Sequence, residues 1–351
     1  MRIAQVAPLM ESVPPKAYGG TERVVSWITE ELVRQGHDVT LFAAGDSVTS
    51  ANLVPCCPRA LRLEQALDPI AHHVVMLKEI RRRAAEFDII HFHIDYLHFP
   101  LFCDKPNRTL TTLHGRLDLP DLPAVFGAFP EMPLTSISNH QRRPLPAANW
   151  LGTIYHGLPR DRLSYCESPS WDYLAFLGRI CPEKRVDRAI TIAKRVGMKL
   201  KIAAKVDRVD REYFESTIKP MLDDPLIEFL GEIGDDDKAA FLGNAYAMLF
   251  PIDWPEPFGL VMIEAMACGT PVVAYRRGSV PEVVEHGLTG LVVDDEDEAV
   301  AAVRRASMLD RLWVRQRFEE RFSVERMVAG YCALYSDAAT RTEPAVPLAR
   351  A

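Results

Sequence analysis

The stretch Asp253–Ala274, with the sequence DWPEPFGLVMIEAMACGTPVVA, decides how the rest of this chain is interpreted. Within it, Pro257 has a fixed φ angle, and Gly259 allows the backbone to approach a ligand closely. The residues from Gly259 to Cys268 contain no further glycine or proline, which predicts a helix that Gly269 ends. The first N–H groups of such a helix have no intrahelical acceptor, so they favour an anion.

Two glutamates occupy different positions in this stretch. Glu256 stands in the loop ahead of the predicted helix, and Glu264 lies a little over one turn inside it. Carboxylates at these places can accept hydrogen bonds from two sets of hydroxyl groups, while the amides between them hold phosphate. That division of polar groups fits a nucleotide-sugar. The alternative is an ordinary loop and helix with two solvated glutamates.

The pattern E-P-F-G-L-x-x-x-E-A-M-A-x-G-x-P-V-V-A resembles the signature of the family-4 retaining glycosyltransferases, which have the GT-B fold. The resemblance implies that Glu256 faces the transferred sugar and that Glu264 binds the ribose. It also implies that backbone amides hold the sugar and the diphosphate, namely those of Phe258, Gly259, Leu260 and Val261.

Length and composition indicate a globular protein with two domains. The chain has 351 residues, of which 48% are hydrophobic and 25% charged. No apolar run approaches the roughly eighteen residues of a membrane-spanning helix. The charged helix predicted after Gly20 argues against a signal peptide, so we expect a cytoplasmic protein with no transmembrane segment.

Charge and cysteine content exclude other classes. The formal net charge of −7 argues against nucleic acid as a partner. The seven cysteines are odd in number and form no C-x-x-C pair, so we expect reduced thiols rather than disulfides or a zinc site.

The beginning of the chain predicts a strand, a glycine loop, a helix and a second strand. The segments are Ile3–Leu9, Gly19-Gly20, about Glu22–Gln35 and Val39–Ala43. This order opens a doubly wound α/β domain, in which phosphate can rest on the loop. A pair of glycines is more often just a turn, but the resemblance implies that Gly19 and Gly20 contact the donor phosphates or the acceptor.

Further strands of the first half are predicted at 88–93, 109–113, 134–137 and 152–155. His114 directly follows one of them, at a carboxyl end where open sheets place ligands. The resemblance implies that His114 contacts the primary hydroxyl of the sugar or stabilises charge beside the anomeric carbon. A histidine in this position can also be a capped structural residue.

Four residues near the strand at 88–93 form a cluster of metal-ligating types, His91, His93, Asp95 and His98. Alternation along a strand puts His91 and His93 on one face, as in zinc pairs. The GT-B chemistry implied by the resemblance needs no metal, so we expect core or acceptor-pocket histidines and no metal site.

The second half begins with a predicted strand, Tyr173–Gly178, followed by Arg179 to Lys184. This segment resembles the G-R-[LI]-x-P-E-K motif of the family and places Gly178 in the site, although Arg185 replaces the usual glycine after the lysine. Cleavage of a sugar–phosphate bond leaves a diphosphate with added negative charge. Arg179 and Lys184 can stabilise that charge in the transition state. The alternative is a pair of surface cations in loose ion pairs.

Other predicted strands of this half lie at 199–204, 226–230, 246–250 and 290–293. Lys205 ends the first of these strands and adds a phosphate contact in our prediction. The resemblance implies that the backbone near Ile233 holds the nucleotide base. The acidic runs 235–237 and 294–298 are interpreted as helix starts, not as a metal-binding D-x-D.

The predicted fold is α/β GT-B, with two Rossmann-like doubly wound domains facing a cleft. Its parts are an acceptor domain (1–158), a donor domain (173–318), a C-terminal helix packing back on the first domain (319–339) and a flexible tail (340–351). His156 stands where many family members have asparagine, which leaves its hinge or acceptor contact open. The opening PPKAYGGTER is most like the subgroup typified by the glycosyltransferase of avilamycin biosynthesis.

The predicted function is transfer of a hexose to an acceptor hydroxyl with retention, without metal or cofactor. The donor is a nucleoside diphosphate sugar, with UDP-glucose as first choice and GDP-mannose second. The acceptor is a small molecule, a glycan or a lipid-linked molecule, and the protein is a monomer or homodimer. Two alternatives stay open: a GT-B epimerase or phosphorylase, and a non-catalytic nucleotide-sugar-binding protein.

Overall fold

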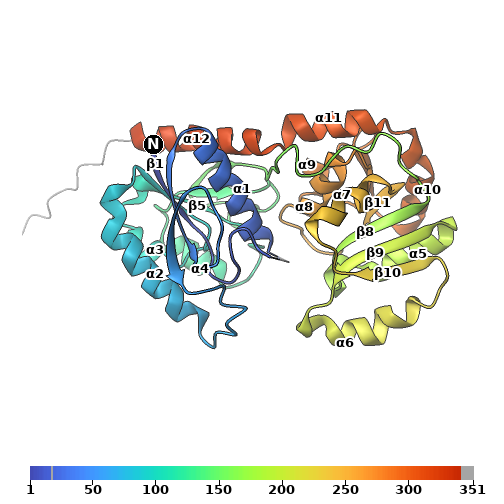
Figure 1. The fold of residues 1–351 in the computed structure, drawn as a ribbon, viewed down its shortest axis with the longest axis horizontal. Helices are drawn as coiled ribbons and strands as arrows, with labels where there is room; N and C mark the ends of the chain where they lie inside the picture. Colours follow the sequence, from blue (N-terminus) through green and yellow to red (C-terminus); the bar gives the residue numbers. More distant parts are fainter. Residues whose placement is uncertain (17–18, 341–351) are drawn as a thin grey trace, which may run out of the picture. The chain divides into compact units, whose positions relative to one another are not determined.

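The computed structural model describes residues 1–16 and 19–340 (Figure 1). The chain divides into two compact units. The first comprises Met1–Ile137, Pro144–Ile154 and the C-terminal segment from Met327, and the second comprises Ser138–Arg143 and Tyr155–Arg326. Among the described residues, no helix combines the length and the apolar character needed to cross a membrane.

The first unit contains a parallel sheet with the strand order β3-β2-β1-β4-β5-β6-β7. The order reverses between β1 and β4, which is the topological switch point of a doubly wound sheet. The strands are β1 (Arg2–Val6), β2 (Asp38–Ala44), β3 (Asn52–Cys57), β4 (Ile89–Phe92), β5 (Thr109–Thr112), β6 (Leu134–Ser136) and β7 (Trp150–Thr153).

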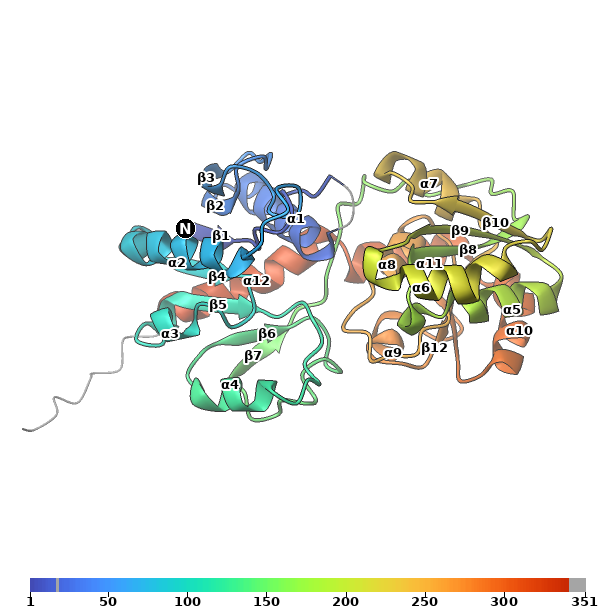
Figure 2. The ribbon, with the colours of Figure 1, turned by 90° about the horizontal axis from the view of Figure 1, so that it is seen from below.

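Helices cover both faces of the first sheet. They are α1 (Gly20–Arg34), α2 (Pro69–Arg83), α3 (Phe99–Phe102), α4 (Leu122–Ala128) and α12 (Val324–Thr340). Apolar residues of α2, α3 and α4 pack with one face, where Val6, Phe42 and Phe92 point. The opposite face bears α1 and α12, and Figures 1 and 2 show α12 running beside β1. Alternation along the central strands therefore buries side chains on both faces of the sheet, as in β1.

The second unit contains a second parallel sheet, with the order β10-β9-β8-β11-β12-β13. Its strands are β8 (Tyr173–Arg179), β9 (Lys199–Lys205), β10 (Ile227–Gly231), β11 (Ala247–Phe250), β12 (Val272–Tyr275) and β13 (Gly290–Val293). The sheet again reverses its order, here between β8 and β11. Ligands of such sheets bind outside the carboxyl ends of the strands at this point.

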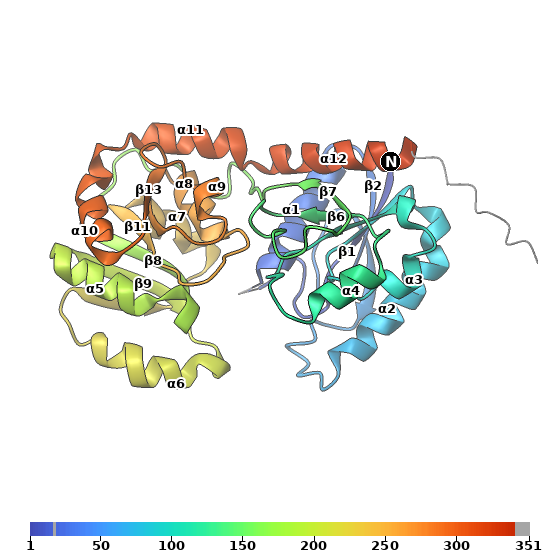
Figure 3. The ribbon, with the colours of Figure 1, turned by 180° about the vertical axis from the view of Figure 1, so that it is seen from behind.

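The helices of the second unit are α5 (Val186–Val196), α6 (Arg211–Tyr213), α7 (Asp235–Gly243), α8 (Leu260–Ala267), α9 (Val280–Val283), α10 (Glu296–Arg305) and α11 (Arg311–Arg321). The pair α5 and α10 packs on one face, whereas α8 and α11 pack together on the other (Figure 3). The carboxyl ends of β8, β9 and β11 therefore lie at the same end of the sheet, and α8 begins at that end.

The strand and helix predictions agree with the structure to within about three residues at most boundaries. Two differences are informative. The strand β3 was not predicted, because Pro55 interrupts it and only Cys57 of it is buried. The helix α1 begins at Gly20 rather than Glu22, so Gly20 lies in its first turn.

The unit boundaries differ from the predicted domains. Residues 138–143 belong to the second unit, where the carboxylate of Glu282 accepts the backbone N–H groups of Asn139 and His140, each at 2.7 Å. The end of the chain consists of α11 and then α12 rather than one helix over 319–339, and α12 packs on the first unit from Met327 onward. The predicted tail lies outside the described residues from position 341.

Candidate active site

The loop between β11 and α8 holds Glu256 in a buried position, with 7% of the residue exposed. Its carboxylate accepts a hydrogen bond from Nζ of Lys184 and another from the indole Nε1 of Trp254, at 2.9 Å. The ammonium of Lys184 also lies over the ring of Trp254, 5.1 Å from its centroid. These contacts hold the carboxylate in a fixed orientation.

The backbone of this loop is fixed from the segment after β12. Ser279 donates its N–H to the carbonyl of Glu256 at 2.9 Å and its hydroxyl to the carbonyl of Phe258 at 2.8 Å. Gly278, with φ of +56°, packs so closely that a Cβ atom there would clash with the backbone N and O of Glu256. Substitution of Gly278 would therefore displace Glu256.

The helix α8 begins directly after Gly259, whose φ of +80° favours glycine. No side chain of the described residues caps its first turn, so its N–H groups face the loop. Glu264 lies on the second turn at 5% exposure and accepts a hydrogen bond from Nζ of Lys238 at 2.9 Å. Leu260 and Val261, which were predicted to contact ligand through their amides, form the half-buried first turn.

Two cations end the neighbouring strands β8 and β9. Arg179 and Lys205 are partners in the parallel register and share Asp207, at 3.7 Å and 3.0 Å respectively. Nε of Arg179 also lies 3.4 Å from Asp210. Burial raises the pKa of Asp210, although Arg179 opposes that shift. The two predicted phosphate contacts therefore lie side by side.

In the first unit, the half-buried His114 follows β5 and ends a chain of buried polar groups. Its Nε2 lies 2.9 Å from Nδ1 of His93, and Nε2 of His93 lies 2.9 Å from Oε1 of Gln5. The amide of Gln5 donates to the hydroxyl of Tyr335 at 3.2 Å, and this hydroxyl lies 2.7 Å from Nδ1 of His91. The chain connects β1, β4 and β5 to α12.

This chain identifies one donor nitrogen of His93. The carbonyl oxygen of Gln5 can only accept, so His93 donates from Nε2. Nδ1 of His93 faces Nε2 of His114. Burial lowers the pKa of His114 to about 3, so its ring is neutral at physiological pH. His114 therefore does not supply positive charge.

The other predicted residues lie in or beside strands and helices. Gly19 directly precedes α1 and Gly20 opens it, both in the first unit. Gly178 lies within β8, and Ile233 is half-buried between β10 and α7. Ala17 and Tyr18 lie outside the described residues.

The three histidines of the cluster of metal-ligating residue types contact other protein groups. Both ring nitrogens of His91 and of His93 lie at hydrogen-bond distance from protein groups, and Nε2 of His98 lies 2.9 Å from Oγ1 of Thr111. Asp95 adopts a left-handed backbone with φ of +52°. Within residues 1–16 and 19–340 there is no group of three residues placed to hold a metal ion.

The structure brings together part of the predicted site. Lys184 and Glu256 are in direct contact, and Arg179 is beside Lys205, whereas His114 belongs to the other unit. Sequence reasoning missed Lys238, the partner of Glu264, and nothing in the sequence around α7 indicates that contact. Trp254 was likewise given no role, although it lies within Asp253–Ala274.

Comparison with known families is consistent with this geometry. The family model described as Glycosyltransferase Family 4 matches residues 18–201, more than half of the chain. The chain belongs to glycosyltransferase family 4. A second model, described as Glycosyl transferases group 1, matches residues 169–321 of this family-4 chain and includes the loop of Glu256. The predicted family is thereby confirmed.

A curated relative of this family-4 chain is an uncharacterised glycosyltransferase of Methanocaldococcus jannaschii, 27% identical over 191 residues. That match covers 52% of this chain and 53% of the relative. The chain spans about half the length of this relative and no more than 34% of three others.

Solved structures establish the fold of the family-4 chain. The crystal structure of AviGT4, a glycosyltransferase involved in avilamycin A biosynthesis, is similar with a TM-score of 0.74 and 23% identity, covering 97% of this chain and 99% of that one. The structure of HepE from Anabaena in complex with UDP and glucose gives 0.73 and 18% identity, with 96% and 100% covered. The predicted GT-B fold, with two parallel sheets, is confirmed.

Proposed function

We propose that this chain is a retaining, metal-independent hexosyltransferase that uses a nucleoside diphosphate sugar and needs no cofactor. The observation that carries the proposal is the pair of buried glutamates on either side of the start of α8, each held by a lysine from another element. UDP-glucose is the first candidate donor and GDP-mannose the second. The complex of HepE with UDP and glucose supports a uridine donor.

In the proposed donor site, carboxylates bind the hydroxyl groups of the donor, and cations and backbone amides bind its diphosphate. Glu256 accepts hydrogen bonds from hydroxyl groups of the hexose, and Glu264 accepts those of the ribose. The amides at the start of α8 and the side chains of Arg179, Lys184 and Lys205 face the diphosphate. Lys184 has three N–H donors, so it can hold Glu256 and a phosphate oxygen at the same time. Fixed cations thus take the place of a metal ion.

The proposed reaction needs no protein nucleophile. The bond between the anomeric carbon and the diphosphate oxygen breaks, and the acceptor oxygen forms its bond to the same face of that carbon. The acceptor proton passes to the departing diphosphate. Cations aimed at the diphosphate stabilise the charge that develops on it, which lowers the barrier. The contact of His114 with a sugar hydroxyl stays a prediction, in which its ring acts as a neutral group because burial lowers its pKa.

The first experiment measures release of nucleoside diphosphate from UDP-, GDP-, ADP- and dTDP-sugars, with and without candidate acceptors. We expect turnover of one donor class. Lys184→Ala should reduce kcat/KM by about 10²-fold, because it removes charge from the leaving diphosphate. Glu264→Ala should reduce kcat/KM mainly by raising KM, because the ribose hydroxyls do not react. The matched controls are Glu215→Ala and Lys219→Ala, which remove the members of an exposed ion pair in the same unit and should leave the rate unchanged.

Additional measurements separate the alternatives. Proton NMR of the product reports whether the anomeric configuration is retained. Conversion of the donor without any acceptor indicates an epimerase, and dependence on inorganic phosphate indicates a phosphorylase. If no donor turns over and no nucleotide raises the melting temperature, the proposed function is wrong.

A further inference from the structure

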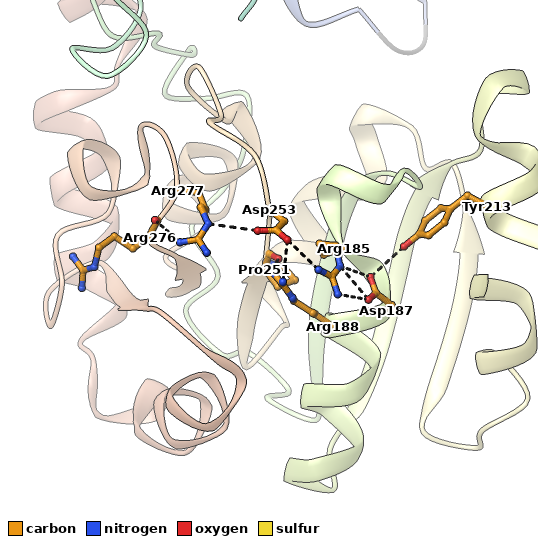
Figure 4. Close-up of polar contacts among 8 residues, drawn as sticks. All are labelled: Arg185, Asp187, Arg188, Tyr213, Pro251, Asp253, Arg276 and Arg277. Carbon is orange, nitrogen blue, oxygen red and sulfur yellow. Dashed lines mark hydrogen bonds and ion pairs between the residues drawn. The ribbon is translucent and has the colours of Figure 1, made fainter. Parts of the chain in front are cut away.

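Asp253 lies at the centre of a charged cluster just ahead of Glu256 (Figure 4). Its carboxylate accepts hydrogen bonds from Arg185 at 3.1 Å and Arg188 at 3.0 Å, and forms an ion pair with Arg277 at 3.5 Å. Arg185 and Arg188 come from the start of α5, whereas Arg277 follows β12. The loop that carries Glu256 is therefore held from two sides.

Three consecutive residues before α5 contact this same loop. The carbonyl of Glu183 accepts the backbone N–H of Asp253 at 2.8 Å. The ammonium of Lys184 donates to Glu256, and the guanidinium of Arg185 donates to Asp253. The segment that ends at Arg185 therefore holds the loop of Glu256 from one side, and Ser279 holds it from the other.

Arg185 adopts a left-handed backbone conformation, with φ of +54° and ψ of +53°. Side chains other than glycine adopt it with strain, which persists only where the surroundings hold it. The guanidinium of Arg185 binds both oxygens of Asp187, at 3.0 and 3.1 Å from Nε. The hydroxyl of Tyr213 fixes Asp187 at 3.1 Å (Figure 4). The motif that this segment resembles has glycine here, so this chain has a strained backbone and a side chain that reaches Asp253.

We propose that Arg185 is a positioning residue: through Asp253 it fixes the loop so that Glu256 stays in contact with Lys184. The catalytic consequence rests on the proposed function, whereas the positioning is a property of the segment itself. Burial opposes ionisation of Asp253, but Arg188, Arg185 and Arg277 outweigh it and keep the pKa of its carboxyl below the usual value. Asp253 is therefore ionised at neutral pH, and its contacts with the three arginines are ion pairs.

The variant Arg185→Gly removes the guanidinium and also relieves the backbone strain, because glycine accepts this φ angle. Arg188 and Arg277 still contact Asp253, so we expect the loop to shift rather than to detach. The kcat for nucleoside diphosphate release should fall about tenfold, because misplacement by an ångström or less weakens transition-state contacts. The KM for the donor should change less than about threefold. Arg185→Lys, which keeps charge but loses the fork, should restore part of kcat.

A double-mutant cycle tests whether Arg185 acts through Asp253. Asp253→Asn should lower kcat to a similar degree, and the double variant should be no slower than Asp253→Asn alone. Additive losses would show that Arg185 acts independently of Asp253 and would contradict the proposal. Arg195→Ala, which removes an exposed arginine near the end of the same helix α5, is the matched control and should have wild-type kinetics.

A second readout needs no turnover. The indole N–H of Trp254 donates to Glu256, so its nitrogen-15 NMR resonance reports the position of the loop. It can be assigned with Trp254→Phe. Arg185→Gly should shift or broaden this resonance, whereas Arg195→Ala should leave it unchanged.

The outcomes are separable. Wild-type kcat together with a wild-type Trp254 resonance in Arg185→Gly would overturn the proposal. A melting temperature lowered by more than about 10 °C would instead assign Arg185 a role in folding stability and would also overturn it. If the wild type turns over no donor, the proposed function fails, and the Trp254 resonance still decides whether Arg185 positions the loop.

Discussion

The two units hold their candidate site residues with different forces. In the first, His114 ends a chain of neutral groups that runs through His93 and Gln5 to Tyr335, and all but His114 are buried. In the second, the candidate residues are ions paired with ions, as in the contact of Lys184 with Glu256. The stability of a neutral buried chain depends on a donor and an acceptor meeting at every hydrogen bond. The stability of an ion cluster depends on its total charge.

The difference has a practical consequence. Loss of one partner in the neutral chain leaves a buried donor or acceptor without a hydrogen bond, so stability decreases. Loss of one ion beside several others mainly changes the local field, so we expect activity to decrease more than stability. The predictions that follow test this contrast.

The largest predicted effect is a loss of folding stability at acidic pH. Burial lowers the pKa of His91, His98 and His114, so these rings are neutral in the folded state and protonated in the unfolded state below pH about 6.5. Each contributes stability above that pH and loses about 1.4 kcal/mol per pH unit below it, down to its own folded pKa. Glu22 and Asp95, with raised pKa values from burial, offset part of the loss at the lowest pH.

Hydrogen exchange followed by mass spectrometry at pH 7.5, 6.5, 5.5 and 4.5 measures this effect in each unit separately. The first unit should lose protection at higher pH than the second. In the second, lowered pKa values of carboxyls such as Asp253 and Asp187 preserve stability until the pH falls through those lowered values. Earlier loss of protection in the second unit would contradict the comparison.

Removal of one ion should have the next largest effect. Arg179→Ala should lower kcat/KM for donor turnover by about 10²-fold, since it removes charge aimed at the leaving diphosphate. Stability should fall by less than about 1 kcal/mol, because the arginine is a third exposed and Asp207 keeps Lys205 as a partner. Steady-state kinetics and urea unfolding measure the two quantities. A loss of stability with unchanged kinetics would reverse the assignment.

Removal of one hydroxyl from the neutral chain should give the opposite pattern. Tyr335→Phe removes the oxygen that accepts from Gln5 and contacts His91, so unfolding should become easier by about 1–3 kcal/mol. Activity per folded molecule should stay within about twofold. Tyr331→Phe is the matched control, since its hydroxyl contacts only Thr112 among the described side chains, and it should cost less. Equal losses would show that the two contacts of the Tyr335 hydroxyl contribute no more than the single contact of Tyr331, which would contradict the role of the chain.

The sequence predicted the strands and α8 well for a physical reason. Strands of a parallel sheet are buried on both faces, so β1 (RIAQV) and β8 (YLAFLGR) are mostly apolar and could be predicted without tertiary information. The helix α8 lies between Gly259 and Gly269, which mark both of its ends. The strand β3 at the sheet edge lacks that apolar signal and was missed.

The site was predicted as residues but not as contacts. Glu256 and Lys184 were singled out through two separate motifs, and their direct contact follows only from the neighbouring positions of β8 and β11 in the sheet. Gln5 and His93 are far apart in the chain, and no local pattern indicates that they meet. The strained backbone of Arg185 was likewise hidden, although its replacement of a glycine pointed to the position.

The smallest predicted effect concerns Lys238, the partner that sequence reasoning missed. Lys238→Met keeps most of the side-chain length but removes the ammonium that donates to Glu264, with a side chain only 16% exposed. If Glu264 binds the ribose, the Kd for the nucleoside diphosphate should rise about fivefold, equivalent to about 1 kcal/mol. The kcat should stay unchanged, because the ribose hydroxyls do not react. Calorimetric titration with UDP and GDP measures the first quantity. A lowered kcat at unchanged Kd would place Lys238 beside the reacting phosphates and would make Glu264 part of the charged group that includes Glu256.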